Sequence, residues 1–190
     1  MSKVFDVSRM SAEERQELVQ LGVISPSGDL LPYQPPPRRE GQAPVPKKAV
    51  SAPSVLNEAY AYEIPSSFSR AMRVDLGDVT LLFISGTASI NEKGETVHVG
   101  DFRAQCWRTY RNITQLLEAE GATWHDVVRC TCYLRDIERD YEEFNRIRTA
   151  FFKWMQLDPL PASVGVQARL CRSELLVEIE ALAIVQKDRG

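Results

Sequence analysis

The sequence has no excess of basic residues, no long apolar run and few residues of the types that bind metals. Its 23 Lys and Arg are outnumbered by 26 Asp and Glu, for a net charge of -3, so it lacks the positive field on which nucleic-acid binding depends. No apolar run approaches the roughly 20 residues of a membrane span, and the first residues, MSKVFDVSRMSAEERQ, lack the apolar stretch of a signal peptide. We therefore expect a cytoplasmic protein that binds neither nucleic acid nor membrane.

Cysteine and histidine are too sparse to form a recognisable metal site. Cys130 and Cys132 resemble half of one, but no second cysteine pair or nearby histidine completes it. His98 and His125 each stand alone. We expect small buried thiols in a reducing compartment, and no metal or organic cofactor. The four cysteines are Cys106, Cys130, Cys132 and Cys171.

Residues 1–60 differ in composition from the rest of the chain. Ser11 and Glu14 form a capping box, which predicts a short helix that ends at Gly22. Seven prolines from Pro32 to Pro53 exclude regular helix or a central strand. We expect an extended arm, which is either disordered or lies over a neighbouring subunit. The apolar residues that could anchor it are Val4, Phe5, Leu30, Leu31, Tyr33, Val55 and Leu56.

Residues 61–190 show the periodicity of a second, folded domain. The predicted order is strand, strand, helix, strand, helix, strand, strand, in which each helix crosses over one face of a mixed sheet. The fold class is therefore α+β, with both helices packed on one face of the sheet. The expected strands are at 69–74, 80–85 and 127–134, with two more within 161–185. One helix follows Asp101 and continues to about Glu120. The other begins at a capping box of Asp140 and Glu143 and runs through Phe144, Ile147, Phe151 and Trp154.

The last stretch, Pro161 to Val185, reads as two strands around a short polar turn and contains two carboxylates on one strand face. From Leu176 onward, apolar residues alternate with Glu178 and Glu180, so one face of the strand is core and the other carries both acids, roughly 7 Å apart. Two interpretations remain open. The acids either form a ligand site or belong to the solvated face of an edge strand.

This stretch, PASVGVQARLCRSELLVEIEALA, resembles the C-terminal signature of the reactive intermediate deaminase family, also called Rid, YjgF-like or endoribonuclease L-PSP. The likeness continues back to about Ser66 through FISGTASI, the helix start GDFRAQ, GATWHDVVRCTCYLRDI and FNRIRTAFF. It covers about two thirds of the chain. The resemblance implies a chorismate-mutase-like fold and a homotrimer, with a central barrel and ligand clefts between neighbouring subunits.

The resemblance also implies roles for individual residues. Glu178 matches the carboxylate that orders water or moves protons in deaminating members, and Phe68 stands where a tyrosine often faces the cleft. Apart from the resemblance, Gly86 at the end of the second strand either lets a ligand approach the backbone closely or is a bulge or strand-end glycine with no ligand role. Ser163 stands where deaminating members have an arginine that binds the substrate carboxylate, and a serine hydroxyl cannot form the charged, bidentate fork of a guanidinium. Two arginines could supply the missing charge: Arg169, which shares the strand parity of Ser163, and Arg172 in the following turn.

These features favour a Rid-type hydrolase, similar to imine and enamine deaminases, whose substrate is a small metabolite with a carboxylate. We expect Glu178 rather than Glu180 to be its functional acid, and little 2-aminoacrylate deaminase activity unless another residue replaces the missing arginine. One alternative is a non-enzymatic trimer that binds a metabolite or regulates another protein. Another is a chorismatase-like enolpyruvyl hydrolase, because ARLCRSELLVEIEA also resembles the end of the chorismatases, where Glu178 and Arg172 could match functional residues. Chorismatases, however, carry a second domain for which the first 60 residues are too short.

Overall fold

The computed structural model describes residues 6–63 and 65–187. The chain divides into two compact units, residues 1–44 and residues 45–190, and each is described by itself. The folded second unit thus begins at Val45, earlier than the boundary expected between residues 60 and 61.

The first unit contains a short 3-10 helix, η1 (Val7–Arg9), and the helix α1 (Ala12–Gln20). The hydroxyl of Ser11 caps α1 by accepting a hydrogen bond from the backbone N–H of Glu14 at 3.0 Å. Gly22, with φ of 72°, follows the end of the helix. The predicted helix is therefore confirmed. Of the expected anchors of the arm, Leu30, Leu31 and Tyr33 are exposed, and Val4 and Phe5 lie outside the described residues.

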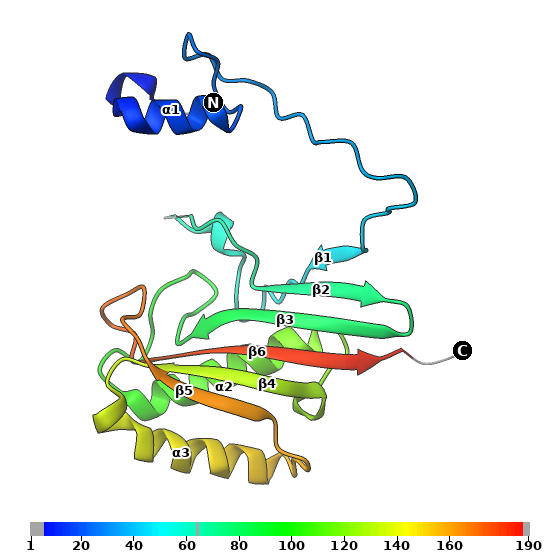
Figure 1. Ribbon diagram of the computed structural model, residues 1–190. Helices are drawn as coiled ribbons and strands as arrows, with labels where there is room; N and C mark the ends of the chain where they lie inside the picture. The colour runs from blue at the N-terminus through cyan, green and yellow to red at the C-terminus, as the bar shows by residue number, and fades with distance from the viewer. Residues whose placement is uncertain (1–5, 64, 188–190) are drawn as a thin grey trace. The chain divides into compact units, whose positions relative to one another are not determined.

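The second unit is built on a six-stranded mixed sheet with the order β1-β2-β3-β6-β4-β5 (Figure 1). All neighbouring strands are antiparallel except β4 and β5, which are parallel. The two strands of the last stretch are therefore not neighbours, because β6 inserts between β3 and β4 while β5 takes the edge. The strands are β1 (Lys47–Ala49), β2 (Ala71–Leu76), β3 (Val79–Ala88), β4 (Val127–Leu134), β5 (Ala162–Gln167) and β6 (Val177–Gln186).

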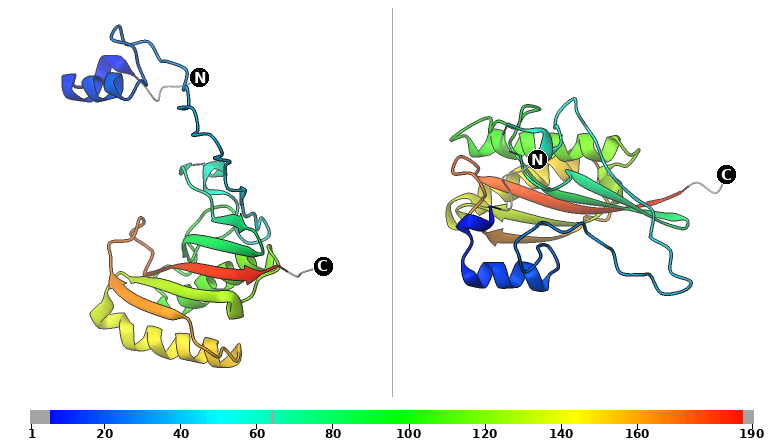
Figure 2. Two further views of the ribbon diagram at one scale, coloured as in Figure 1. Left: turned by 45° about the vertical axis from the view of Figure 1, so that its right-hand side comes forward. Right: turned by 90° about the horizontal axis from the view of Figure 1, so that it is seen from above.

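Two long helices, α2 (Phe102–Glu118) and α3 (Ile137–Trp154), pack on one face of this sheet (Figures 1 and 2). The carboxylate of Asp101 caps α2 by accepting from the N–H of Ala104, as expected. The predicted start of α3 was wrong. Asp136 is its N-cap, and Asp140 is a buried residue of the first turn that pairs with Arg139 at 2.6 Å. The α+β class, with a mixed sheet and two covering helices, is confirmed.

Residues 45–60 belong to the second unit rather than to a separate arm. The three residues of β1 extend the sheet at its edge, where neighbouring prolines are tolerated. Val50, Val55 and Leu56 are then buried in the main core, and the 3-10 helix η2 (Ala59–Ala61) follows. The prolines excluded a central strand, as expected, but they did not prevent packing.

The core between helices and sheet is aromatic and contains three thiols. Trp124, in the 3-10 helix η3 (Trp124–Asp126), packs with the rings of Tyr110, Phe151 and Phe152. Trp154, the last residue of α3, is 73% exposed. Burial raises the pKa of Cys130 to about 12. Cys106, Cys130 and Cys132 are buried as expected, whereas Cys171 is exposed.

Within the described residues, no helix is both long and apolar enough to cross a membrane.

Candidate functional site

A cavity of about 130 Å³ surrounds the Glu178 side chain on the sheet face away from the helices. Three segments build it: the chain from η2 into β2, the end of β3, and the connection 168–176 with the start of β6. Phe68, Gly86, Arg172 and Glu178 line it. The structure therefore brings together four residues that sequence reasoning selected as site candidates.

Glu178 lies directly against the backbone of Gly86. A Cβ atom added to Gly86 would come within 2.0 Å of Oε1 of Glu178. The register between β3 and β6 shifts between Ile84 and Thr87, so Gly86 lies in a bulge of β3. Of the two interpretations of Gly86, the bulge is confirmed, and the space at its Cα is filled by the Glu178 carboxylate.

The surroundings of Glu178 favour its protonated form. Burial in the cavity raises the pKa of Glu178 above its ordinary value of 4.5, and the negative charge of Glu180 raises it further. The positive charge of Arg70 acts in the opposite direction. A carboxyl group whose pKa is raised by burial in a cavity is a candidate general acid or base.

Arg70 is a buried cation in this cavity that sequence reasoning missed. It is 4% exposed, and its guanidinium lies between the rings of Tyr62 and Phe68, 5.0 Å and 5.1 Å from their centroids. Its Nε donates to the carbonyl oxygen of Asn57 at 3.1 Å. One signal in the sequence could have found it. Arg70 follows Phe68 by two residues at the start of a strand, and residues two apart in a strand lie on the same face.

Tyr62 supplies a hydroxyl group to the same cavity. Its Oη is buried and has no hydrogen-bond partner among the described residues. Phe68, at the position where the resembled family often has a tyrosine, contributes only a ring. Tyr62 lies upstream of every motif that carried the resemblance, so no sequence signal pointed to it.

The two arginines proposed to supply a charge differ in position. Arg172 lines the Glu178 cavity, but its Nη1 donates to the carbonyl oxygen of Gly94 and to Thr96, so it ties two loops together. Arg169 is exposed and lies beyond the end of β5, so its expected strand parity with Ser163 was wrong. It lines a neighbouring shallow depression of about 230 Å³ that Glu178 and Glu180 also border.

Ser163 lies apart from the other candidate residues. It is on β5, with β4 between it and β6. Its hydroxyl lies 3.8 Å from the thiol of the buried Cys132 and accepts from Arg148 of α3, so it points to the helix-covered face. Glu178 is on the opposite face. Ser163 and Glu178 of one chain therefore cannot contact the same small ligand.

No group of three or more His, Cys, Asp or Glu side chains in the described parts of the chain is arranged to hold a metal ion.

Comparisons with known proteins agree with this fold. The family described as endoribonuclease L-PSP matches residues 61–185. A RutC family protein of Pyrococcus abyssi is 33% identical over 117 residues, which cover 61% of this chain and 84% of the relative. The 3-aminoacrylate deaminase RutC of Acinetobacter baylyi is 30% identical over 105 residues, which cover 55% of this chain and 79% of the relative. The crystal structure of the YjgF gene product of E. coli is similar with a TM-score of 0.59 at 26% identity, over 73% of this chain and 99% of that one.

Proposed function

This chain belongs to the endoribonuclease L-PSP family, and from that premise we propose that it hydrolyses an enamine or imine of a small carboxylic acid and releases ammonia. The Acinetobacter relative, named for 3-aminoacrylate deamination, supports this substrate class. The observation that carries the proposal is the Glu178 carboxyl group, half-buried in a small cavity with its pKa raised. A net charge of -3 argues against RNA as the substrate, in spite of the family's name.

Glu178 is the proposed acid and base of this reaction. An enamine first takes a proton from solvent on carbon and becomes an iminium ion. The Glu178 carboxylate then takes a proton from water as the water oxygen attacks the iminium carbon, which gives a carbinolamine. Glu178 returns that proton to nitrogen as the C–N bond breaks, and the carbinol O–H releases its proton to solvent as the carbonyl forms. The products are ammonia and the corresponding carbonyl compound, so the step needs no oxidant and no cofactor.

Arg70 and Tyr62 are the proposed partners of Glu178. The positive charge of Arg70 opposes the rise in the pKa of Glu178, and so favours the ionised form that a base requires. The unpaired hydroxyl of Tyr62 can donate a hydrogen bond to the substrate or to the attacking water. Both groups are held by packing within one unit, so they need no rearrangement when a ligand enters.

We further propose a homotrimer in which the cleft lies between subunits. Ser163 and Glu178 lie on opposite faces and two strands apart, so a ligand that touches both must bind two copies of the chain. The sheet face without helices exposes Phe83, Val164 and Ile184, and such a patch favours association.

Light scattering is expected to give a mass three times the 21.5 kDa of the chain. A second variant tests whether the open sheet face forms the contact. Phe83→Lys places a charge in that patch and is expected to shift the protein towards monomers. A measured mass of 21.5 kDa for the wild type would show a monomer and would contradict the proposed cleft between subunits.

The direct test of the function is an assay of ammonia release. The protein is added to 3-aminoacrylate, to 2-aminoacrylate and to 2-imino acids generated in situ by an amino-acid oxidase, and the rate is compared with that of spontaneous hydrolysis. An acceleration of at least one of them is expected. If the protein binds such compounds but accelerates none, it is a metabolite-binding protein and the hydrolase proposal is wrong.

Gly86→Ala is expected to lower the hydrolysis rate roughly 100-fold, because the new methyl group occupies the position of the Glu178 carboxylate and displaces it by an ångström or more. The melting temperature should change little, since the displaced atoms are the end of a flexible side chain and Gly86 has no positive φ. Turnover and thermal unfolding are measured on the same preparation. Unchanged turnover in a folded variant would mean that the position of Glu178 is not critical.

A further inference from the structure

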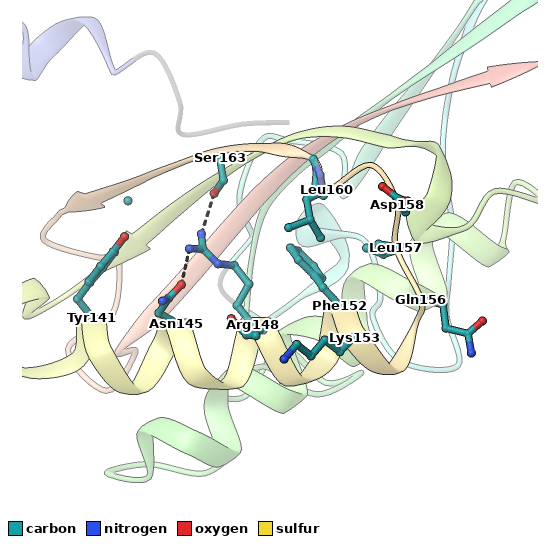
Figure 3. A pocket seen from close by; sticks show the side chains of 13 residues that line it. Tyr141, Asn145, Arg148, Phe152, Lys153, Gln156, Leu157, Asp158, Leu160 and Ser163 are labelled. Atoms are coloured by element: carbon teal, nitrogen blue, oxygen red, sulfur yellow. Dashed lines mark hydrogen bonds between the residues drawn. The ribbon is translucent and has the colours of Figure 1, made fainter.

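Another cavity, larger than the one at Glu178, lies between the helix α3 and the edge strand β5, with a volume of about 630 Å³ (Figure 3). This volume is in the range of small-molecule sites, which run from roughly 300 to 1,000 Å³. Apolar side chains form one part of its wall, namely Phe152, Leu157 and Leu160. Polar and charged side chains form the rest.

Arg148 of α3 points into this cavity and is held in place by three neighbours (Figure 3). Its Nη1 donates to the hydroxyl of Ser163 at 3.0 Å, and its Nη2 donates to Oδ1 of Asn145 at 2.7 Å. Its guanidinium carbon lies 5.4 Å from the ring centroid of the buried Phe144. The side chain is therefore ordered before any ligand arrives, which lowers the entropic cost of binding.

The charge of Arg148 is not neutralised by these contacts. Both of its hydrogen-bond acceptors are neutral, and no carboxylate within the described residues forms a salt bridge with it. The two bonds use two of the five N–H donors of a guanidinium. The cavity wall also includes Lys153 and a single acid, Asp158. Its lining thus carries two positive charges against one negative charge.

We infer that Arg148 binds the carboxylate of a small ligand with an apolar body, and that Ser163 and Asn145 position its guanidinium. The unused donors match the planar geometry of a carboxylate, and the apolar wall accommodates the rest of the molecule. This inference deepens the proposed function, because it names the group that holds the substrate's carboxylate.

The inference also assigns a role to Ser163, as a residue that positions Arg148. A serine at this position supplies no charge itself, but it accepts a hydrogen bond from a guanidinium that a helix brings to the same place. Neither Arg169 nor Arg172 is then needed for this role. In the proposed trimer, the Arg148 cavity of one subunit would face the Glu178 cavity of its neighbour.

Binding of pyruvate and phenylpyruvate to the full chain, measured by calorimetry, tests the inference without any turnover. Both are carboxylates of the proposed product type, and phenylpyruvate should bind more tightly because of the apolar wall. Arg148→Gln is expected to weaken both affinities roughly 10- to 100-fold, the range for a lost charged hydrogen bond. Ser163→Ala should weaken them less, and Ser163→Thr, which keeps the hydroxyl, should retain them.

Arg146→Gln is the matched control, since it removes the same charge from the same helix. Arg146 is exposed and pairs with Glu142 and Glu143, so its loss should leave the affinities unchanged. Equal weakening by Arg146→Gln, unchanged binding in Arg148→Gln, or no carboxylate binding by the wild type would each overturn the inference. If the affinities change as expected but the wild type shows no turnover, the inference stands and only the proposed hydrolase activity is rejected. If the wild type shows turnover but Arg148→Gln binds both compounds as tightly as the wild type, the hydrolase activity stands and the inference is rejected.

Discussion

Glu178→Gln is expected to lower the rate of ammonia release at least about 100-fold, the smaller end of the range for general acid–base catalysis. Glutamine keeps the size of the side chain and its place over Gly86 but can neither take nor return a proton. The same variant should be more stable than the wild type at neutral pH, because burial of the ionised carboxylate opposes folding. Loss of activity together with a gain in melting temperature marks a residue kept for function.

The pH dependence of that stability gain follows from the sign of the pKa shift. The pKa of Glu178 is higher in the folded protein than its ordinary value of 4.5. The unfolded chain therefore ionises first as the pH rises, and the wild type loses stability until the pH passes the folded pKa. The difference in the free energy of unfolding between Glu178→Gln and the wild type should reach its full value above the pKa of Glu178 in the folded protein, and it should be absent below about pH 4.5.

Glu180→Gln is the control for both measurements. Glu180 lies two residues along the same face of β6 and does not line the Glu178 cavity, and it also borders a depression with Phe83, Arg129 and Thr131. Its replacement should leave turnover within a few-fold of the wild type. The assignment fails if Glu178→Gln remains active while Glu180→Gln does not.

Trp124→Ala should have the largest effect on stability, a loss of about 3–5 kcal/mol in the free energy of unfolding. The indole is 2% exposed and packs edge-on against Tyr110 and Phe151, at centroid distances of 5.6 Å and 5.2 Å. Its Nε1 donates to the hydroxyl of Thr114 at 2.8 Å. Alanine leaves a cavity at the junction of both helices with the sheet, and chemical denaturation measures the loss.

Trp154→Ala removes the same side chain from an exposed position and is the matched control. Trp154 is 73% exposed at the end of α3, so its loss should change the free energy of unfolding by about 0.5 kcal/mol or less. Similar losses in the free energy of unfolding for the two variants would show that the burial of Trp124 does not stabilise the protein as expected.

The sequence by itself determined most of the long helices and strands and which of their faces are buried. The alternation around Glu178 fixed which side of β6 is core, because side chains of a strand alternate strictly. The aspartate caps and apolar stripes placed α2 and most of α3, since their signals lie within a few residues of one another. The family resemblance, carried by ordered motifs from Ser66 onward, led to the correct fold and selected Phe68 and Glu178. Gly86 and Arg172 were selected from their places at a strand end and in a turn, and all four residues line one cavity.

Only the tertiary structure decided which distant residues complete each site. Arg70 and Tyr62 reach Glu178 because β2, β3 and β6 are neighbours, and Arg148 reaches Ser163 because α3 crosses over β5. Such pairings depend on strand order and helix placement, which local periodicity does not encode. The same limit explains the two tryptophans. The burial of a tryptophan depends on what packs opposite its ring, and only the folded chain brings Tyr110 and Phe152 to Trp124.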